Sequence, residues 1–149
     1  MLILFVCTGN TCRSPMAMGL FQEMAKKEGL HNVVTDSAGI IAVDGLPPSE
    51  NAIEALKEED IDISGYTSKK ITEELIKSAD LIVGISTHHI ISIVSLIPET
   101  ASKTVLLGFG IDDPYGLTLD DYKETREEIK NALTDLLEVV KNYGEAKNS

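Results

Sequence analysis

The fold is decided by residues 2–15, which read LILFVCTGNTCRSP. The first five of them, Leu2 to Val6, are all apolar, and such a run is typical of a strand buried on both faces of a parallel sheet. A turn follows at Thr8-Gly9-Asn10, and Ser14 with Pro15 predicts the N-cap and the first residue of a helix. The chain is therefore expected to open with a strand, a tight turn and a helix.

Strand-like and helix-like segments alternate along the rest of the chain. Further strands are expected at Val33–Ser37, Asp80–Ile85 and Thr104–Leu107. Further helices are expected after Ser49, from Thr72 as an N-cap, over His88–Leu96, and after a capping box at Thr118–Asp121. The alternation predicts an α/β fold, namely an open sheet of parallel strands with helices on both faces. Ligands of such sheets bind at the carboxyl ends of the strands.

The composition limits the class of protein. The 149 residues include 13 Lys and Arg against 24 Asp and Glu, which gives a formal net charge of −11, and 43% of them are hydrophobic. This length and balance predict one domain over residues 1–149, with a frayed tail at 144–149. The acidic balance counts against nucleic acid and anionic membranes as partners, because both attract clustered Lys and Arg.

The N-terminus and the cysteines indicate the compartment. The apolar run at the N-terminus lacks a basic flank and is too short for a signal peptide or a membrane span. The two cysteines, Cys7 and Cys12, lie too close together for a structural disulfide framework. We therefore expect a cytoplasmic protein in a reducing environment.

Residues 7–13 have the composition of an anion-binding loop. Five residues separate Cys7 from Arg13, enough for backbone N–H groups to surround one tetrahedral anion. Gly9 and Asn10 tolerate the positive φ that turns those amides inward. The start of the following helix adds positive potential, and Arg13 can grip two phosphate oxygens at once. A thiol surrounded by such donors is expected to have its pKa lowered, which would make Cys7 a nucleophile aimed at phosphorus.

The same residues have other interpretations. The loop lacks the Gly-Lys-Ser/Thr of a nucleotide P-loop and the glycines of a dinucleotide fingerprint. His31, His88 and His89 have no spacing that suits zinc, so we expect no metal and no other cofactor. His88 and His89 follow the third expected strand near the ligand edge, and we expect them on an ordinary helix surface, with the rim of the site as the alternative. The simplest alternative is that Cys7 is only a small buried residue at the end of a strand.

A thiolate that attacks phosphorus also needs an acid, because the leaving group departs poorly without a proton. Asp113 lies in a Gly-rich loop after the last expected strand, on the predicted ligand edge. Its neighbour Asp112 is the alternative. Ser14 is positioned to donate a hydrogen bond to the sulfur.

The sequence resembles the low-molecular-weight protein tyrosine phosphatase family over essentially its whole length. The resemblance rests on C-x5-R-S after one strand and on Asp113-Pro114-Tyr115 late in the chain. It implies the phosphotyrosine phosphatase I fold, a three-layer, Rossmann-like or flavodoxin-like arrangement around an open, twisted, four-stranded parallel sheet in the order 2-1-3-4. It also implies Cys7 as nucleophile, Arg13 as phosphate clamp and Asp113 as general acid and then base. The substrate-binding residues that we expect are Thr8, Gly9, Asn10, Thr11, Cys12, Ser14 and Tyr115, with Ser37 helping to shape the loop.

The walls of the site decide the substrate. Tyrosine-directed members commonly have an aliphatic residue where this chain has Thr11, and the loop CTGNTCRS resembles that of the bacterial protein arginine phosphatases. A hydroxyl suits a polar guanidinium, and Gly116 removes an aromatic wall that would stack on a phenol ring. The sequence thus indicates a phosphatase that works through phosphocysteine on phosphoarginine in proteins, with inorganic phosphate bound in the loop. Thr11 could instead serve local backbone bonding.

Other functions stay open at this point. The first alternative is a phosphotyrosine phosphatase, and the second is an arsenate reductase, which would need redox cysteines beyond Cys12. A non-catalytic anion-binding or redox-sensing module is the third. By the same resemblance, Cys12 could form a reversible disulfide with Cys7 that protects the nucleophile from oxidation, or it could be a packing residue.

Overall fold

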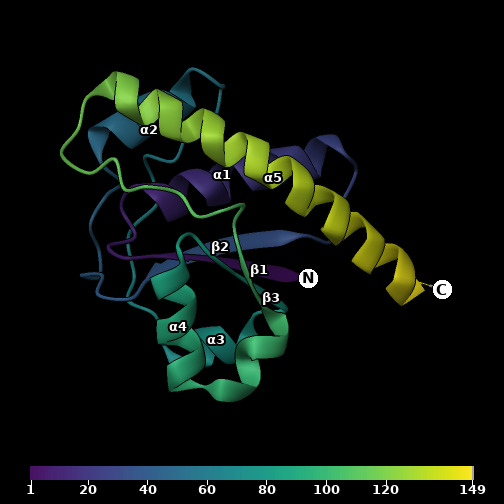
Figure 1. Ribbon diagram of the computed structural model, residues 1–149. Coiled ribbons are helices and arrows are strands. Elements are labelled where there is room, and N and C mark those ends of the chain that lie inside the picture. The colour runs from purple at the N-terminus through teal and green to yellow at the C-terminus, as the bar shows by residue number, and fades with distance from the viewer. Residues whose placement is uncertain (149) are drawn as a thin grey trace.

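The computed structural model contains the expected sheet (Figure 1). Residues 1–148 are described, with side chains through Tyr143. The strands are β1 (Leu2–Cys7), β2 (Val34–Gly39), β3 (Leu81–Gly84) and β4 (Thr104–Leu106), which pair in parallel in the order β2-β1-β3-β4. The α/β class and the strand order are therefore confirmed. The tail that the sequence predicts to be frayed, residues 144–149, lies outside the residues whose side chains are described.

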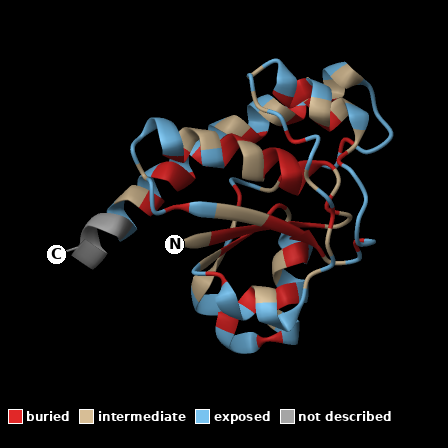
Figure 2. Cartoon of the chain, turned by 180° about the vertical axis from the view of Figure 1, so that it is seen from behind, coloured by how far each residue is buried: buried red, intermediate tan, exposed pale blue. Residues whose placement is uncertain are grey.

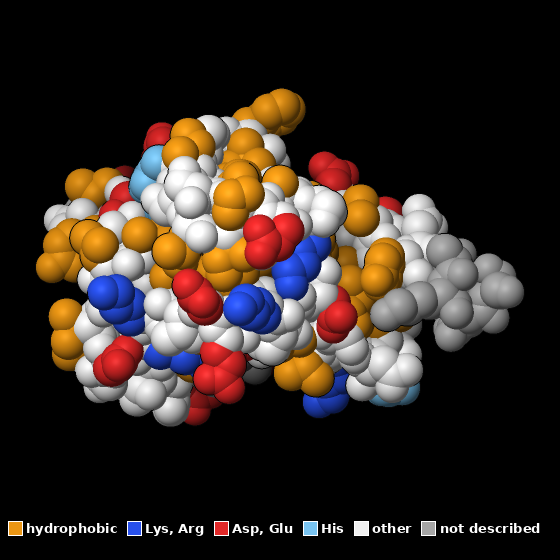
Figure 3. Space-filling view, turned by 90° about the horizontal axis from the view of Figure 1, so that it is seen from below, with side chains coloured by type: hydrophobic (Ala, Val, Ile, Leu, Met, Phe, Trp, Pro, Cys, Tyr) orange, Lys and Arg blue, Asp and Glu red, His pale blue; other side chains and the backbone are white. Residues whose placement is uncertain are grey.

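Helices cover both faces of the sheet, as expected (Figure 1). One side carries α1 (Arg13–Lys27), α2 (Glu50–Lys57) and α5 (Leu119–Asn148), and the other carries α3 (Glu73–Ser78) and α4 (Thr87–Leu96), followed by a 3-10 helix at Pro98–Lys103. No described helix is long and apolar enough to span a membrane. On the face that includes α3 and α4, basic side chains are interspersed with acidic ones and form no continuous basic patch (Figure 3).

Strand β1 lies inside the sheet and is buried on both faces (Figure 2). Its side chains alternate between the faces, as strand geometry requires. Ile3 and Phe5 belong to the core shared with α1 and α5, whereas Leu4 and Val6 belong to the smaller core shared with α3 and α4. The two cores explain the uninterrupted apolar run in the sequence. The alternation also places Cys7 on the α1 side of the sheet.

The start of α1 differs from the expected start. The helix begins at Arg13, with Cys12 at the N-cap position, and no side chain caps it. The predicted N-cap role of Ser14 is therefore wrong, because its hydroxyl lies 2.8 Å from the Cys7 sulfur instead. Pro15 is tolerated inside the first turn, since helical N–H groups there have no intrahelical partner.

The other boundaries shift by only a few residues. β2 runs beyond Ser37 to Gly39 because it keeps pairing with β1 as far as Cys7. The capping box of α5 is confirmed, since the Thr118 N–H donates to Asp121 Oδ2 at 3.1 Å and the Asp121 N–H donates to Thr118 Oγ1 at 3.2 Å.

The larger core should depend on its aromatic pair. Phe21 is fully buried, and its ring centroid lies 5.9 Å from that of Phe5. Phe21→Ala is expected to lower the free energy of unfolding by about 3–5 kcal/mol, through lost contacts and a residual cavity. Equilibrium urea unfolding measures the change, with Val34→Ala, which is 57% exposed, as the control. Equal effects of the two substitutions would contradict this account of the core.

Candidate active site

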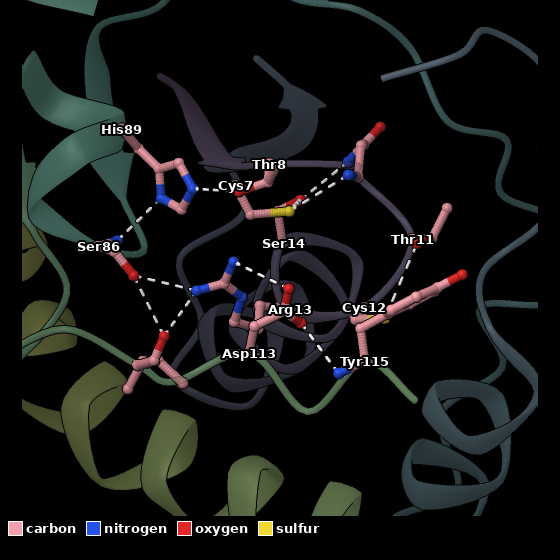
Figure 4. Close-up of polar contacts among 12 residues, drawn as sticks. Cys7, Thr8, Thr11, Cys12, Arg13, Ser14, Ser86, His89, Asp113 and Tyr115 are labelled. Atoms are coloured by element: carbon pink, nitrogen blue, oxygen red, sulfur yellow. Dashed lines mark hydrogen bonds and ion pairs between the residues drawn. The ribbon is translucent and has the colours of Figure 1, made fainter. Parts of the chain in front are cut away.

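The expected site forms at the carboxyl end of β1. Residues 7–13 curl from the strand into α1 around a cavity of about 210 Å³ (Figure 4). The cavity is lined by Cys7, Thr8, Gly9, Asn10, Thr11, Cys12, Arg13, Asp113 and Tyr115. The other two expected residues stand behind this lining, Ser14 in contact with Cys7 and Ser37 with Asn10. In the described part of the chain, no group of three or more His, Cys, Asp or Glu side chains is placed to hold a metal ion.

The Cys7 thiol lies at the base of the cavity and is 2% exposed. Its sulfur lies 2.8 Å from Ser14 Oγ and accepts the Asn10 N–H at 3.3 Å. Burial raises the pKa of the thiol, while hydrogen bonds from Ser14 and Asn10 and the charge of Arg13 oppose that effect. The lowered pKa expected from the sequence is therefore wrong in direction, because desolvation of the sulfur outweighs the donors around it.

Asn10 fixes the direction of the hydrogen bonds around the thiol. Its Nδ2 donates to Ser14 Oγ and to Ser37 Oγ, each at 2.9 Å. Because Ser14 Oγ already accepts from Asn10, the Ser14 hydroxyl hydrogen is free to point at the Cys7 sulfur. Ser14 is thus a donor to the sulfur, which is the arrangement that stabilises a thiolate.

Tyr66 and Lys69 hold Asn10 in place. Asn10 has a φ of 59°, in the left-handed region. Its Oδ1 accepts the Lys69 N–H at 2.9 Å and the Tyr66 hydroxyl at 2.8 Å. Burial raises the pKa of Tyr66 to about 12, so this hydroxyl keeps its proton. Sequence analysis missed both residues, because they follow Asn10 by 56 and 59 residues and belong to no recognisable motif.

The Arg13 guanidinium is held by two segments beyond the loop. Nη1 donates to the Ile111 carbonyl at 2.7 Å and to Ser86 Oγ at 3.0 Å. Nη2 lies 3.7 Å from Asp113 Oδ2, and only 4% of the Arg13 side chain is exposed. The guanidinium therefore has a fixed position at the cavity. Ser86 and Ile111 gave no signal in the sequence, because their role depends on the sheet bringing separate strand ends together.

The mouth of the cavity is formed by Asp113, Tyr115 and Thr11. Asp113 Oδ1 accepts the Tyr115 N–H at 3.0 Å, and the Asp113 side chain is 48% exposed. Tyr115 is 74% exposed, so its ring is open to a ligand. The alternative acid, Asp112, is exposed and is not part of the cavity lining.

The Cys12 thiol is buried and unoxidised, as is Cys7. Its sulfur lies 3.2 Å from the Tyr122 hydroxyl and 3.5 Å from Ser49 Oγ. Burial, followed by the hydrogen bond to Cys12, raises the pKa of Tyr122 to about 12, so that Tyr122 keeps its proton. The disulfide between Cys7 and Cys12 stays a prediction.

His89 is fully buried, so its expected place on a helix surface is wrong, whereas His88 is exposed as expected. The Nδ1 atom of His89 accepts the Ser86 N–H at 3.0 Å, and the Nε2 atom of His89 lies 2.9 Å from Thr8 Oγ1. Burial, and then the charges of His88 and Arg13, lower the pKa of His89 to about 4. The imidazole is therefore neutral at neutral pH.

The thiol of Cys7 and the guanidinium of Arg13 stand at opposite ends of the loop that lines the cavity. Enzymes that pass a phosphoryl group through a cysteine need this pairing of a nucleophile with a fixed cation. The fold and the site together define that class of hydrolase.

The comparison with known families identifies this class more closely. The family described as low molecular weight phosphotyrosine protein phosphatase matches residues 2–146, and the chain belongs to it. The chain is 40% identical over 146 residues to a protein-arginine-phosphatase of Bacillus subtilis, covering 93% of this chain and 96% of the relative. It is also 40% identical over 131 residues to an arsenate reductase of Staphylococcus aureus, covering 88% and 92%. The structure of a low molecular weight protein tyrosine phosphatase from T. tengcongensis matches with a TM-score of 0.88 at 43% identity, over 93% of this chain and 98% of that one.

The hydrogen bond from Ser14 to the sulfur can be tested by titration. Ser14→Ala removes a group that lowers the pKa of Cys7, so we expect the pKa of this thiol to rise and its alkylation by iodoacetamide at pH 8 to slow severalfold. Mass spectrometry of the Cys7 peptide over a range of pH separates this thiol from Cys12. Ser102→Ala, on an exposed residue, is the control. An unchanged titration in Ser14→Ala would show that the hydroxyl does not donate to the sulfur.

Proposed function

We propose that this member of the family hydrolyses phosphoarginine in proteins through a phosphocysteine intermediate at Cys7. The observation that supports the proposal is the composition of one pocket. A thiol and a braced guanidinium form its base, and the Thr11 hydroxyl and the Asp113 carboxylate line its mouth. The partners are then phosphorylated proteins, and inorganic phosphate is the product. In keeping with the sequence, we propose that the enzyme is cytoplasmic and needs no cofactor.

The first chemical step forms phosphocysteine. The Cys7 thiolate attacks phosphorus, an S–P bond forms, and the P–N bond to the substrate guanidine breaks. The departing nitrogen takes a proton from the Asp113 carboxyl. The transferred phosphoryl oxygens are bound by the loop amides and by Arg13. Because a phosphoryl group competes with Asp113 for Arg13, binding frees the carboxyl to face the leaving nitrogen.

The second step regenerates the thiolate. The Asp113 carboxylate takes a proton from a water molecule, the water oxygen attacks phosphorus, and the S–P bond breaks. The sulfur leaves as a thiolate, to which Ser14 and the Asn10 N–H donate. These donors favour the charged sulfur against the burial that disfavours it. Inorganic phosphate then leaves the pocket.

The preference for arginine is proposed from the mouth of the pocket. A guanidine carries N–H donors that need acceptors once they leave water, and Thr11 and Asp113 supply a hydroxyl and a carboxylate there. Overall identity does not add to this argument, because a protein-arginine-phosphatase and an arsenate reductase are each 40% identical to this chain. Gly116 has a φ of 78°, a conformation that favours glycine. The turn therefore accounts for the glycine itself, and its effect on the substrate through the missing aromatic wall stays a prediction.

A phosphotyrosine phosphatase is the second candidate, because the exposed Tyr115 ring lines the pocket and could pack against a phenol ring. The arsenate reductase relative suggests a third activity, but reduction of arsenate needs further thiols that supply two electrons by forming a disulfide, and the chain has no cysteine beyond Cys12. A non-catalytic anion-binding module would have no need of the Asp113 carboxylate at the mouth.

Substitution of the two reacting groups tests the mechanism. Cys7→Ser is expected to abolish turnover while inorganic phosphate still binds, because the cradle is kept and the nucleophile is lost. Asp113→Asn is expected to lower kcat by about 10²–10⁴-fold, the usual range for general acid–base catalysis. Steady-state kinetics and calorimetry measure the two effects, with Asp112→Asn as the matched control. Turnover in Cys7→Ser would refute the covalent route, and a larger loss in Asp112→Asn would transfer the acid role to Asp112.

The substrate preference depends on a single side chain. Thr11→Ile replaces the hydroxyl by an alkyl group, so we expect the kcat/KM ratio of phosphoarginine to phosphotyrosine peptides to fall at least about tenfold, the scale of an unpaired polar group. Thr11→Ser keeps the hydroxyl and should keep the preference. If the ratio does not change in Thr11→Ile, arginine specificity does not come from this residue.

A further inference from the structure

The buried imidazole of His89 lies between Thr8, at the start of the loop that lines the cavity, and Ser86, which binds Arg13 at the end of that loop (Figure 4). On one side, His89 Nε2 lies 2.9 Å from Oγ1 of Thr8, the residue that follows Cys7. On the other side, His89 Nδ1 accepts the Ser86 N–H at 3.0 Å, and Ser86 Oγ accepts from Arg13 Nη1 at 3.0 Å. The mechanism proposed above assigns no task to this histidine.

The contact with Ser86 decides which nitrogen of the ring carries the proton. Ser86 N–H is a backbone donor, so Nδ1 must accept and has no hydrogen of its own. The neutral ring then carries its hydrogen on Nε2 and donates it to Thr8 Oγ1. Thr8 is therefore the acceptor in this pair, and its hydroxyl hydrogen is available to another group.

That hydrogen has no acceptor among the described residues, since the one hydrogen bond of the Thr8 hydroxyl is the bond it accepts from His89. Thr8 is half-buried and lines the cavity beside Cys7 and Arg13. We propose that His89 is a positioning residue that turns the Thr8 hydroxyl into a hydrogen-bond donor to an oxygen of the bound phosphoryl group. This inference rests on the proposed function for its ligand and adds one side-chain donor to the loop amides and Arg13.

The same ring also restrains the support of Arg13. The ring Nδ1 of His89 accepts the Ser86 N–H, and the backbone N–H of His89, which is not part of the ring, donates to the Ser86 carbonyl at 3.1 Å. Ser86 Oγ also donates to the Ile111 carbonyl at 3.2 Å, and this carbonyl is the second acceptor for Arg13. Loss of the imidazole would therefore loosen the phosphate cradle at its first residue and at its arginine.

The test compares variants that separate the two nitrogens of the ring. Thr8→Val removes the hydroxyl and keeps the shape, and His89→Asn keeps an acceptor near Nδ1 but loses the donor at Nε2. Each is expected to weaken inorganic phosphate binding, measured by calorimetry and as the product inhibition constant, by about tenfold, the scale of one hydrogen bond to an anion. KM for 4-nitrophenyl phosphate should rise similarly, while kcat changes less than about twofold, because the lost bond also exists in the ground state.

The double variant and a rescue variant show whether His89 acts through Thr8. Thr8→Val with His89→Asn should bind phosphate no more weakly than the weaker single variant, because both remove the same bond. His89→Gln, whose amide N–H can reach Thr8, should bind phosphate more tightly than His89→Asn. His31→Asn, on an exposed histidine, controls for the loss of an imidazole.

Two outcomes would overturn the inference, and a third would refute only the proposed function. Unchanged phosphate affinity in Thr8→Val would show that its hydroxyl does not bind the ligand, and this variant answers the question even if His89→Asn does not fold. Additive losses in the double variant would show that His89 does not act through Thr8. A wild-type protein that binds phosphate but hydrolyses no phosphoarginine or aryl phosphate would refute the proposed function alone, because the binding comparison would still test the Thr8–His89 pair.

Discussion

The rest of the site depends on a buried sulfur that only hydrogen-bond donors face. A thiol that is 2% exposed loses the water that would stabilise its charged form. Hydrogen-bond donors compensate for the lost water, and their direction is fixed. The Asn10 side-chain amide donates to Ser14, which leaves the Ser14 hydroxyl to donate to the Cys7 sulfur. The direction is set from outside the loop, where the Lys69 N–H fixes the carbonyl end of the Asn10 amide. The loop is therefore a polar network whose orientation is imposed by distant backbone.

This network requires β2 to approach the loop closely. Gly39 pairs with Cys7 at the end of β2, and a Cβ at this position would lie 2.6 Å from the Thr8 carbonyl and 3.0 Å from Asn10 Cβ. Any larger side chain would push the loop away from the strand that supports it. The opposite edge of the site comes from the β3–α4 and β4–α5 segments, which hold Arg13 through Ser86 and Ile111. The strand order β2-β1-β3-β4 is what brings these segments together around the end of β1.

The sequence predicts what is local and misses what is long-range. The alternation of strand-like and helix-like segments predicts the α/β class, and the apolar run of β1 with the spacing of Cys7 and Arg13 predicts the position of the site, because each of these signals lies in neighbouring residues. The prediction of Ser14 as an N-cap is wrong because a serine before a proline has that preference only where no other partner is near, and the sulfur of Cys7 is such a partner. The side of α4 on which His89 lies, and the support that Tyr66 gives, depend on packing between elements far apart in the chain. The sign of the pKa shift at Cys7 depends on burial, and the spacing of residues carries no measure of burial.

The chain is similar to relatives with different named activities because the base of the site and the residues at its mouth have separate roles. A protein-arginine-phosphatase and an arsenate reductase are each 40% identical to this chain, so overall identity does not choose between their activities. A thiol and a guanidinium around one oxyanion suit either chemistry, because phosphate and arsenate have the same shape and charge. The choice between phosphate hydrolysis and arsenate reduction must therefore come from groups outside the base of the site, namely the residues at the mouth and any further thiols. The chain offers Thr11 and Asp113 at the mouth, while its second thiol, Cys12, contacts the hydroxyls of Tyr122 and Ser49 and is followed by no other cysteine. Those groups favour transfer of a phosphoryl group to water over transfer of electrons.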